Sequence, residues 1–143
     1  MKINKKILMS FGFLILLFLF MSVLFLRGSP QTGEKENVEI VKYNEDGQLI
    51  VYYFWDRNCP VCSVQSEFLK EMEEIYGDEI EIKSFELRIP ENIQTFQQIG
   101  NAYDMRPSGV PTTFIANRYW VGFSSTYRSE IESKIEICIE TVC

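Results

Sequence analysis

The pattern of apolar and polar residues divides the chain near residue 27. Residues 7–26 contain no charged side chain and only two serines. A helix of 20 residues at ~1.5 Å per residue spans about 30 Å, the thickness of the hydrocarbon core of a bilayer. The pattern therefore predicts a basic cytoplasmic segment over 1–6, a transmembrane helix over 7–26 and a polar linker over 27–37.

A cleaved secretory signal is the alternative for the apolar segment. The apolar part of such a signal is usually about 7–15 residues long and ends in an A-x-A-like site. The five residues from Leu26 to Pro30 offer no such site, and no cysteine directly follows the segment for lipid attachment. These observations favour an uncleaved signal anchor.

The basic residues beside the segment predict its orientation. Three lysines lie within residues 1–6, whereas the three basic residues that follow are spread over residues 27–42. Because basic residues favour the cytoplasmic side, we expect a single-pass protein of the cell membrane with residues 38–143 on the extracytoplasmic side. The four cysteines agree with an oxidising or thiol-handling compartment.

From residue 38 onward, the periodicity predicts alternating strands and helices. We expect strands over residues 38–43, 49–55, 79–87, 112–116 and 119–124, and helices over 60–76, 90–103 and from 127 to the end. The near-continuous apolar run from Leu49 to Trp55 is typical of a central strand buried on both faces. The last two strands form a hairpin about Asn117 and Arg118. This order predicts an α/β sandwich.

Helical spacing predicts which side chains face the sheet. Gly77 is expected to end the first helix. The expected inward stripes are Val61, Val64, Phe68, Met72 and Ile75 in the first helix, Ile93, Phe96, Ile99 and Tyr103 in the second, and Ile131, Ile135, Cys138 and Val142 in the third.

The charge excludes some classes of partner. From Gly28 onward the chain has 10 basic and 20 acidic residues, a net charge of −10. That balance argues against binding to nucleic acid or to an anionic membrane surface. The acidic residues are spread along the chain, and no glycine-rich nucleotide-binding motif is present. We expect no metal site and no cofactor.

Cys59 and Cys62 lie where the run from Leu49 to Trp55 gives way to the first helix. The free N–H groups and the partial positive charge of a helix N-terminus favour a thiolate there. Such a setting lowers the pKa of a cysteine from ~8.5 to roughly 3.5–7.5. Cys59 is therefore the predicted nucleophile, and Cys62 the thiol that resolves the mixed disulfide. Pro60 suits the first helical position, which has no need of its N–H.

A zinc half-site is the main alternative for this pair. Its other ligands would have to be Cys138 and Cys143, which lie far along the chain and do not have the compact spacing of structural zinc sites. The chain contains no histidine, which removes the mixed ligand sets and argues against a copper-handling protein. The redox interpretation is favoured.

The C-terminal cysteines form a second candidate pair. Cys138 lies on the apolar stripe of the last helix, and a regular helix would place the Cα atom of Cys143 roughly 8–9 Å away. A disulfide needs a Cα separation of about 4.4–6.8 Å, so bridging requires the helix to unwind at Thr141 and Val142. We predict a structural disulfide. A second electron-relay pair and a buried free thiol at Cys138 are the alternatives.

The order of elements, the cysteine motif and the segment Gly109–Ile115 together resemble the thioredoxin-fold superfamily. The stretches Phe54–Cys62 and Tyr119–Phe123 are most similar to a membrane-linked group of thioredoxin-like thiol–disulfide oxidoreductases in bacteria and archaea. The resemblance covers about residues 47–143. It implies a three-layer sandwich whose central mixed sheet is flanked by helices.

The resemblance also implies a substrate groove. In this family the proline at the place of Pro111 is cis and faces the cysteine motif, which exposes the backbone of Val110 to a substrate segment. Trp55, Pro60 and Val61 are expected to flank the groove. The implied activity is disulfide exchange with protein substrates, with an integral-membrane electron carrier as partner.

Two other functions remain open at this point. A redox-inert binding module of the same fold usually loses one motif cysteine, whereas this chain retains both. The sequence also resembles accessory thiol proteins of bacteriocin export.

Two departures from the family pattern bear on mechanism. Thioredoxin has a buried aspartate six positions before its first active-site cysteine, and Tyr53 occupies that place here. Asp56 lies at the mouth of the strand, so proton relay is left to water or to another acid. The motif also lacks the histidine of strong oxidases. We expect the helix terminus to activate Cys59, with help from Arg57.

Overall fold

The computed structural model describes residues 40–106 and 108–143. Its strands are β1 (Leu49–Trp55), β2 (Ile80–Glu86), β3 (Thr112–Ile115) and β4 (Arg118–Val121). Its helices are α2 (Pro60–Tyr76), α3 (Pro90–Ala102) and α4 (Ser125–Thr141), and a short 3-10 turn, η1 (Gly77–Glu79), joins α2 to β2.

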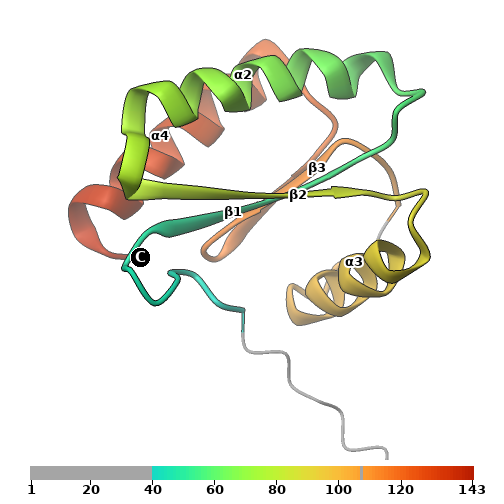
Figure 1. The fold of residues 1–143 in the computed structure, drawn as a ribbon, viewed down its shortest axis with the longest axis horizontal. Coiled ribbons are helices and arrows are strands. Elements are labelled where there is room, and N and C mark those ends of the chain that lie inside the picture. The colour runs from blue at the N-terminus through green and yellow to red at the C-terminus, as the bar shows by residue number, and fades with distance from the viewer. Residues whose placement is uncertain (1–39, 107) are drawn as a thin grey trace, which may run out of the picture. The chain divides into compact units, whose positions relative to one another are not determined.

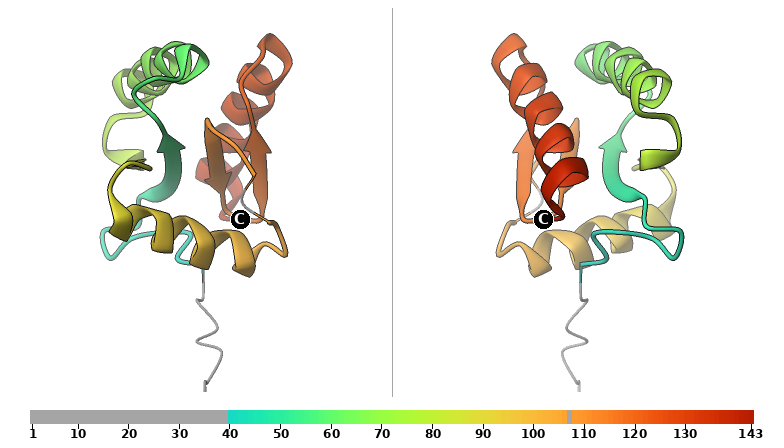
Figure 2. Two further views of the ribbon diagram at one scale, coloured as in Figure 1. Left: turned by 90° about the vertical axis from the view of Figure 1, so that its right-hand side faces the viewer. Right: turned by 90° about the vertical axis from the view of Figure 1, so that its left-hand side faces the viewer.

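The four strands form one mixed sheet in the order β2-β1-β3-β4. β1 runs parallel to β2 and antiparallel to β3, and β3 and β4 form an antiparallel hairpin. Helices α2 and α4 cover one face of the sheet, and α3 covers the other (Figures 1 and 2). The predicted three-layer α/β sandwich is confirmed.

β1 is the central buried strand that its apolar run predicts. Successive side chains of a strand point to opposite faces. Leu49, Val51 and Tyr53 pack in the core shared with α2 and α4, whereas Phe54 packs in the core beneath α3. Consecutive side chains of β1 therefore alternate between the two cores.

The α3 layer is built around aromatic rings. The ring of Phe54 stacks on those of Phe85 and Phe96, with centroids 4.9 and 4.6 Å away. Phe114 meets Phe54 edge-on at 5.8 Å. These four side chains fasten β1, β2 and β3 to α3.

The strand expected over residues 38–43 is wrong for the part that the structure describes. Tyr43 makes only an isolated antiparallel bridge to Leu49. The Asn44 side chain accepts hydrogen bonds from the backbone N–H groups of Asp46 and Gln48 and so fixes a tight turn. The turn reverses the chain between Tyr43 and Leu49.

The predicted inward face of α2 is rotated by about one residue. Phe68 and Met72 are buried as expected, but Val61, Val64 and Ile75 are 44%, 55% and 63% exposed. The buried face is Cys62, Gln65, Phe68, Leu69 and Met72. The apolar periodicity does not indicate this face because Gln65 is polar. In the structure Gln65 is buried, and its Nε2 donates a hydrogen bond to Thr113 Oγ1 at 2.6 Å.

The other two helices differ less from expectation. In α3, Phe96 and Ile99 are buried, whereas Ile93 is 41% exposed. In α4, the predicted side chains are buried except Val142, which is 74% exposed because it lies beyond the last helical residue.

Several boundaries shift by a few residues. The hairpin turns at Ala116 and Asn117 rather than at Asn117 and Arg118, and Ala116 has a positive φ. α4 begins at Ser125 because the Ser124 side chain accepts a hydrogen bond from the N–H of Tyr127. Gly77, with φ +50°, ends α2 as predicted.

The transmembrane helix expected over residues 7–26 lies outside the described residues. Within 40–106 and 108–143, no helix is long and apolar enough to cross a membrane.

Candidate active site

The loop after β1 places Cys59 at the start of α2. The Asp56 carboxylate accepts the Asn58 N–H at 2.7 Å, and the Asp56 carbonyl accepts the Cys59 N–H at 3.0 Å. Cys59 has an extended backbone and is the N-cap of α2, and its Sγ accepts the Cys62 N–H at 3.1 Å. The cysteine thus occupies the helix position at which a negatively charged sulfur is favoured.

Cys59 and Cys62 form a disulfide with a Cα separation of 5.2 Å. Cys62 is 1% exposed, whereas Cys59 is partly exposed. A partner can therefore reach the sulfur of Cys59, and Cys62 can react only within the domain. Pro60 and Val61, in the turn between the two cysteines, are both exposed.

The loop before β3 lies against the reactive sulfur. The Val110 carbonyl oxygen is 3.8 Å from Cys59 Sγ, and the Val110–Pro111 peptide bond is cis, the isomer that the resemblance implies. Thr112 Oγ1 donates to the Gly109 carbonyl at 2.7 Å, and the Pro111 carbonyl accepts the Gly122 N–H at 2.7 Å. These bonds hold the loop from both sides.

Tyr53, on β1, contacts the backbone of the cysteine motif. Its hydroxyl donates to the Cys62 carbonyl at 2.7 Å and lies 3.1 Å from Ser66 Oγ, which also donates to that carbonyl, at 2.9 Å. Burial raises the pKa of Tyr53, against a smaller lowering by the Ser66 hydrogen bond, so the phenol stays protonated at neutral pH. It is a hydrogen-bond donor rather than a base.

Sequence reasoning missed this contact. From the sequence, Tyr53 stands out only as the replacement for an acid. The available signal was a polar-tipped aromatic in an apolar strand together with a serine four residues after Cys62 in the helix.

Arg57 is engaged elsewhere than expected. Its guanidinium makes a two-point ion pair with Glu86, with Nη2 2.7 Å from Oε2. The pKa of Glu86 is lowered chiefly by this hydrogen bond, and that of Arg57 is raised. Because Glu86 offsets the charge of Arg57, the structure does not support a role for Arg57 in activating Cys59.

Asp56 is also tied into the surface. The hydrogen bond from the Asn58 N–H, followed by that from Arg88, lowers the pKa of Asp56. The carboxylate is therefore ionised at neutral pH and is a poor proton carrier. Its contacts assign it to shaping the loop.

Trp55 lies at the end of β1, directly before this loop. Its indole N–H donates to Ser84 Oγ on β2 at 2.9 Å, and the side chain is partly buried. Trp120, by contrast, is buried in the core on β4.

Cys138 and Cys143 form the second disulfide, with a Cα separation of 4.8 Å. α4 ends at Thr141 and Val142 has a φ of +52°, so the chain leaves the helix where the geometry required it. Cys143 bonds Tyr43, which pairs with Leu49 at the start of β1, whereas Cys59 follows the end of β1. One zinc ion cannot contact both pairs.

Comparison with known proteins supports the fold. No protein-family model and no curated protein matches the sequence. A structure from Chlorobium tepidum, described as a thiol:disulfide interchange protein DsbE, is similar at a TM-score of 0.53 and 17% identity, over 66% of this chain and 82% of its own. This similarity shows a thioredoxin-like fold.

Two thioredoxin structures are also similar to this chain. Thioredoxin-2, a component of the malaria parasite protein secretion machinery, has a TM-score of 0.44 at 21% identity, over 59% of this chain and 81% of its own. The thioredoxin Deadhead of Drosophila melanogaster has a TM-score of 0.42 at 16% identity, over 62% and 79%.

Proposed function

We propose that this protein is a thiol–disulfide oxidoreductase that exchanges disulfides with protein substrates through Cys59 and Cys62. The observation that carries the proposal is the disulfide at the N-terminus of α2, with one reachable and one buried sulfur. The thioredoxin-like fold supports the same chemistry.

The exchange proceeds in two displacements. In the reduced protein, the Cys59 thiolate attacks a substrate disulfide, and the substrate sulfur that leaves takes up a proton. Cys62 then loses its proton and attacks Cys59 Sγ, which breaks the mixed disulfide and releases the second substrate thiolate. The substrate gains two electrons and the protein ends as the observed disulfide. The reverse sequence oxidises a substrate dithiol.

The surrounding groups suit these steps. The helix N-terminus and the Cys62 N–H stabilise a negative charge on Cys59 Sγ. Tyr53 and Ser66 hold the Cys62 carbonyl and so keep the buried sulfur in place. The backbone of Val110, beside Cys59 Sγ, can pair with an extended substrate segment.

We further propose that residues 7–26 tether the domain to the cell membrane, with the domain on the extracytoplasmic side. The apolar length of this segment and the lysines before it support the tether and its orientation. A tethered thiol protein can exchange electrons with an integral-membrane carrier, which we propose as its redox partner.

A redox titration tests the chemistry. When the full-length protein is equilibrated with glutathione buffers, we expect the Cys59–Cys62 pair to be half-reduced between ~−270 and ~−120 mV while the protein stays folded. A midpoint near ~−270 mV favours a reductase and one near ~−120 mV an oxidase. A pair that stays oxidised until the protein unfolds would instead be a structural disulfide, which contradicts the proposed function.

A fusion experiment tests the membrane topology. A reporter that is active only in the cytoplasm, fused after Cys143, is expected to be silent, and the same reporter fused to the N-terminus is expected to be active. Strong activity of the C-terminal fusion would mean that the domain lies on the cytoplasmic side and that the proposed orientation is wrong. A mature N-terminus near Gly28 would show that the segment is cleaved.

A further inference from the structure

The C-terminal disulfide has the same asymmetry of burial as the pair at α2. Cys138 is 0% exposed, whereas Cys143 is partly exposed. A thiol from another molecule can therefore approach Cys143 Sγ but not Cys138 Sγ.

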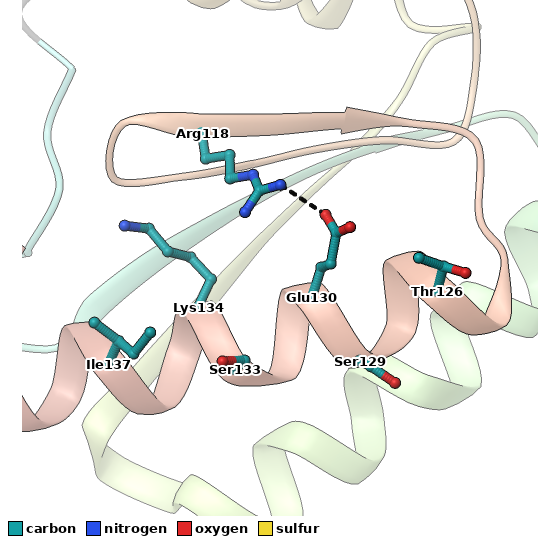
Figure 3. A pocket seen from close by; sticks show the side chains of 7 residues that line it. All are labelled: Arg118, Thr126, Ser129, Glu130, Ser133, Lys134 and Ile137. Carbon is teal, nitrogen blue, oxygen red and sulfur yellow. Dashed lines mark hydrogen bonds and ion pairs between the residues drawn. The ribbon is translucent and has the colours of Figure 1, made fainter.

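Two ammonium groups contact Cys143, one at its sulfur and one at its backbone oxygen. Lys134 Nζ lies 3.4 Å from Cys143 Sγ, and Lys42 Nζ donates to the Cys143 carbonyl at 2.9 Å. Arg118 and Trp120 both bind Glu130, the acid one turn before Lys134. Figure 3 shows the Lys134 side chain directed away from Glu130, toward the end of α4. Among the described residues, Lys134 takes part in none of the ion pairs.

Cys138, the other cysteine, lies beside acidic side chains. Cys138 lines a hollow of about 420 Å³ together with Tyr43, Asp46, Asp78 and Glu79. Nearby positive charge favours a thiolate, whereas burial and nearby carboxylates disfavour it. The ammonium group of Lys134 at Cys143 and the burial of Cys138 thus favour a thiolate at Cys143 over one at Cys138, which distinguishes an attacking sulfur from a resolving one.

Tyr43 would hold the two cysteines in place when the disulfide opens. Its hydroxyl donates to the Cys138 carbonyl at 2.9 Å and accepts the Cys143 N–H at 2.7 Å. Both bonds go to backbone atoms and do not depend on the bond between the sulfurs. The two cysteines can therefore stay close together in the reduced state and close again.

We propose that Cys138–Cys143 is a second exchangeable disulfide, whose partner is a protein dithiol that attacks Cys143. A donor thiolate attacks Cys143 Sγ, the bond to Cys138 breaks, and the Cys138 sulfur leaves and takes up a proton. The second donor thiol loses its proton and attacks the donor sulfur of the mixed disulfide. Cys143 then leaves as a thiolate that Lys134 stabilises, and the donor ends as a disulfide.

This centre works apart from Cys59 and Cys62. The two pairs lie at opposite ends of β1, a strand of seven residues, which at ~3.3 Å per residue separates them by roughly 20 Å. Electrons can pass between them only through another molecule. The C-terminal pair is thus a second contact point for a thiol partner, and the proposal stands without the function proposed for the first pair.

Differential alkylation of the unmodified full-length chain tests the proposal. The protein is equilibrated with glutathione buffers, quenched with acid and alkylated. Trypsin cleaves after Arg57, Lys70 and Lys134, so the pairs are scored separately on peptides 58–70 and 135–143. We expect reversible reduction of peptide 135–143 while circular dichroism stays native. If this peptide remains oxidised under excess reduced glutathione, or is reduced only as the protein unfolds, the disulfide is structural and the proposal is wrong.

A second experiment isolates Lys134. In a Cys138→Ser variant, Cys143 is a free thiol whose alkylation rate is measured against pH. Lys134→Met is expected to shift this profile upward by about one unit, which slows alkylation at neutral pH about tenfold. Lys134→Arg should retain the profile, and Lys70→Met, at an exposed position on α2, serves as the matched control. A profile unchanged by Lys134→Met would remove Lys134 from the site.

Discussion

Replacing Cys59 by serine is expected to reduce disulfide exchange at the α2 site to the rate of the reductant alone. A serine hydroxyl is not ionised at neutral pH and cannot form a disulfide, so no nucleophile remains at the helix N-terminus. Cys62 cannot replace Cys59 because it is 1% exposed. The measurement is the reduction of a peptide disulfide with dithiothreitol as electron donor, by the full-length protein in which Cys138 and Cys143 are replaced by serine so that only the α2 site can react.

Cys62→Ser is expected to give the opposite signature. Cys59 can still attack, but no neighbouring thiol releases it, so mixed disulfides with partner proteins accumulate. These mixed disulfides are reduced when dithiothreitol is added. Their identification would name the substrates. Ser63→Ala is a suitable control, because Ser63 is exposed in the same turn and its hydroxyl donates only to the Pro60 carbonyl. An active Cys59→Ser variant together with a Cys62→Ser variant that traps nothing would overturn the nucleophile assignment.

The parts of the site that lie close together in sequence could be predicted. A buried apolar strand followed by two cysteines and a helix start is a local pattern, and it placed Cys59 and Cys62 correctly at the N-terminus of α2. The unwinding before Cys143 was also predictable, because the fixed rise of a helix sets the distance that a disulfide must close. Local geometry determines both results.

The parts that depend on packing could not be predicted. The sequence contains two overlapping stripes on α2, both of which include Phe68 and Met72. The structure buries the stripe with Cys62 and Gln65, and the Gln65 amide donates a hydrogen bond to Thr113 on a distant strand. The contact of Tyr53 with the Cys62 carbonyl likewise depends on how α2 lies over β1. Lys134 reaches Cys143 only because the chain reverses direction after α4.

Phe54→Ala is expected to have the largest effect on stability. Phe54 is 0% exposed and packs against Phe85, Phe96 and Phe114. The truncation therefore leaves a cavity at the contact between α3 and the three strands β1, β2 and β3. Such changes lower the free energy of unfolding by about 3–5 kcal/mol, which is a large part of the total stability of a small domain. The measurement is denaturant-induced unfolding of the oxidised protein, with the slope m compared between variants.

Ile75→Ala is the matched control for this experiment. Ile75 is 63% exposed on α2, so its truncation is expected to change the free energy of unfolding by less than about 0.5 kcal/mol. Phe54 also lies on the α3 face of the sheet, opposite Cys62, and the folded Phe54→Ala variant should therefore retain the alkylation rate of reduced Cys59. A loss below about 1 kcal/mol for Phe54→Ala would contradict the packing of α3 on β1. A loss comparable to that for Ile75→Ala would mean that the side chain is not buried there.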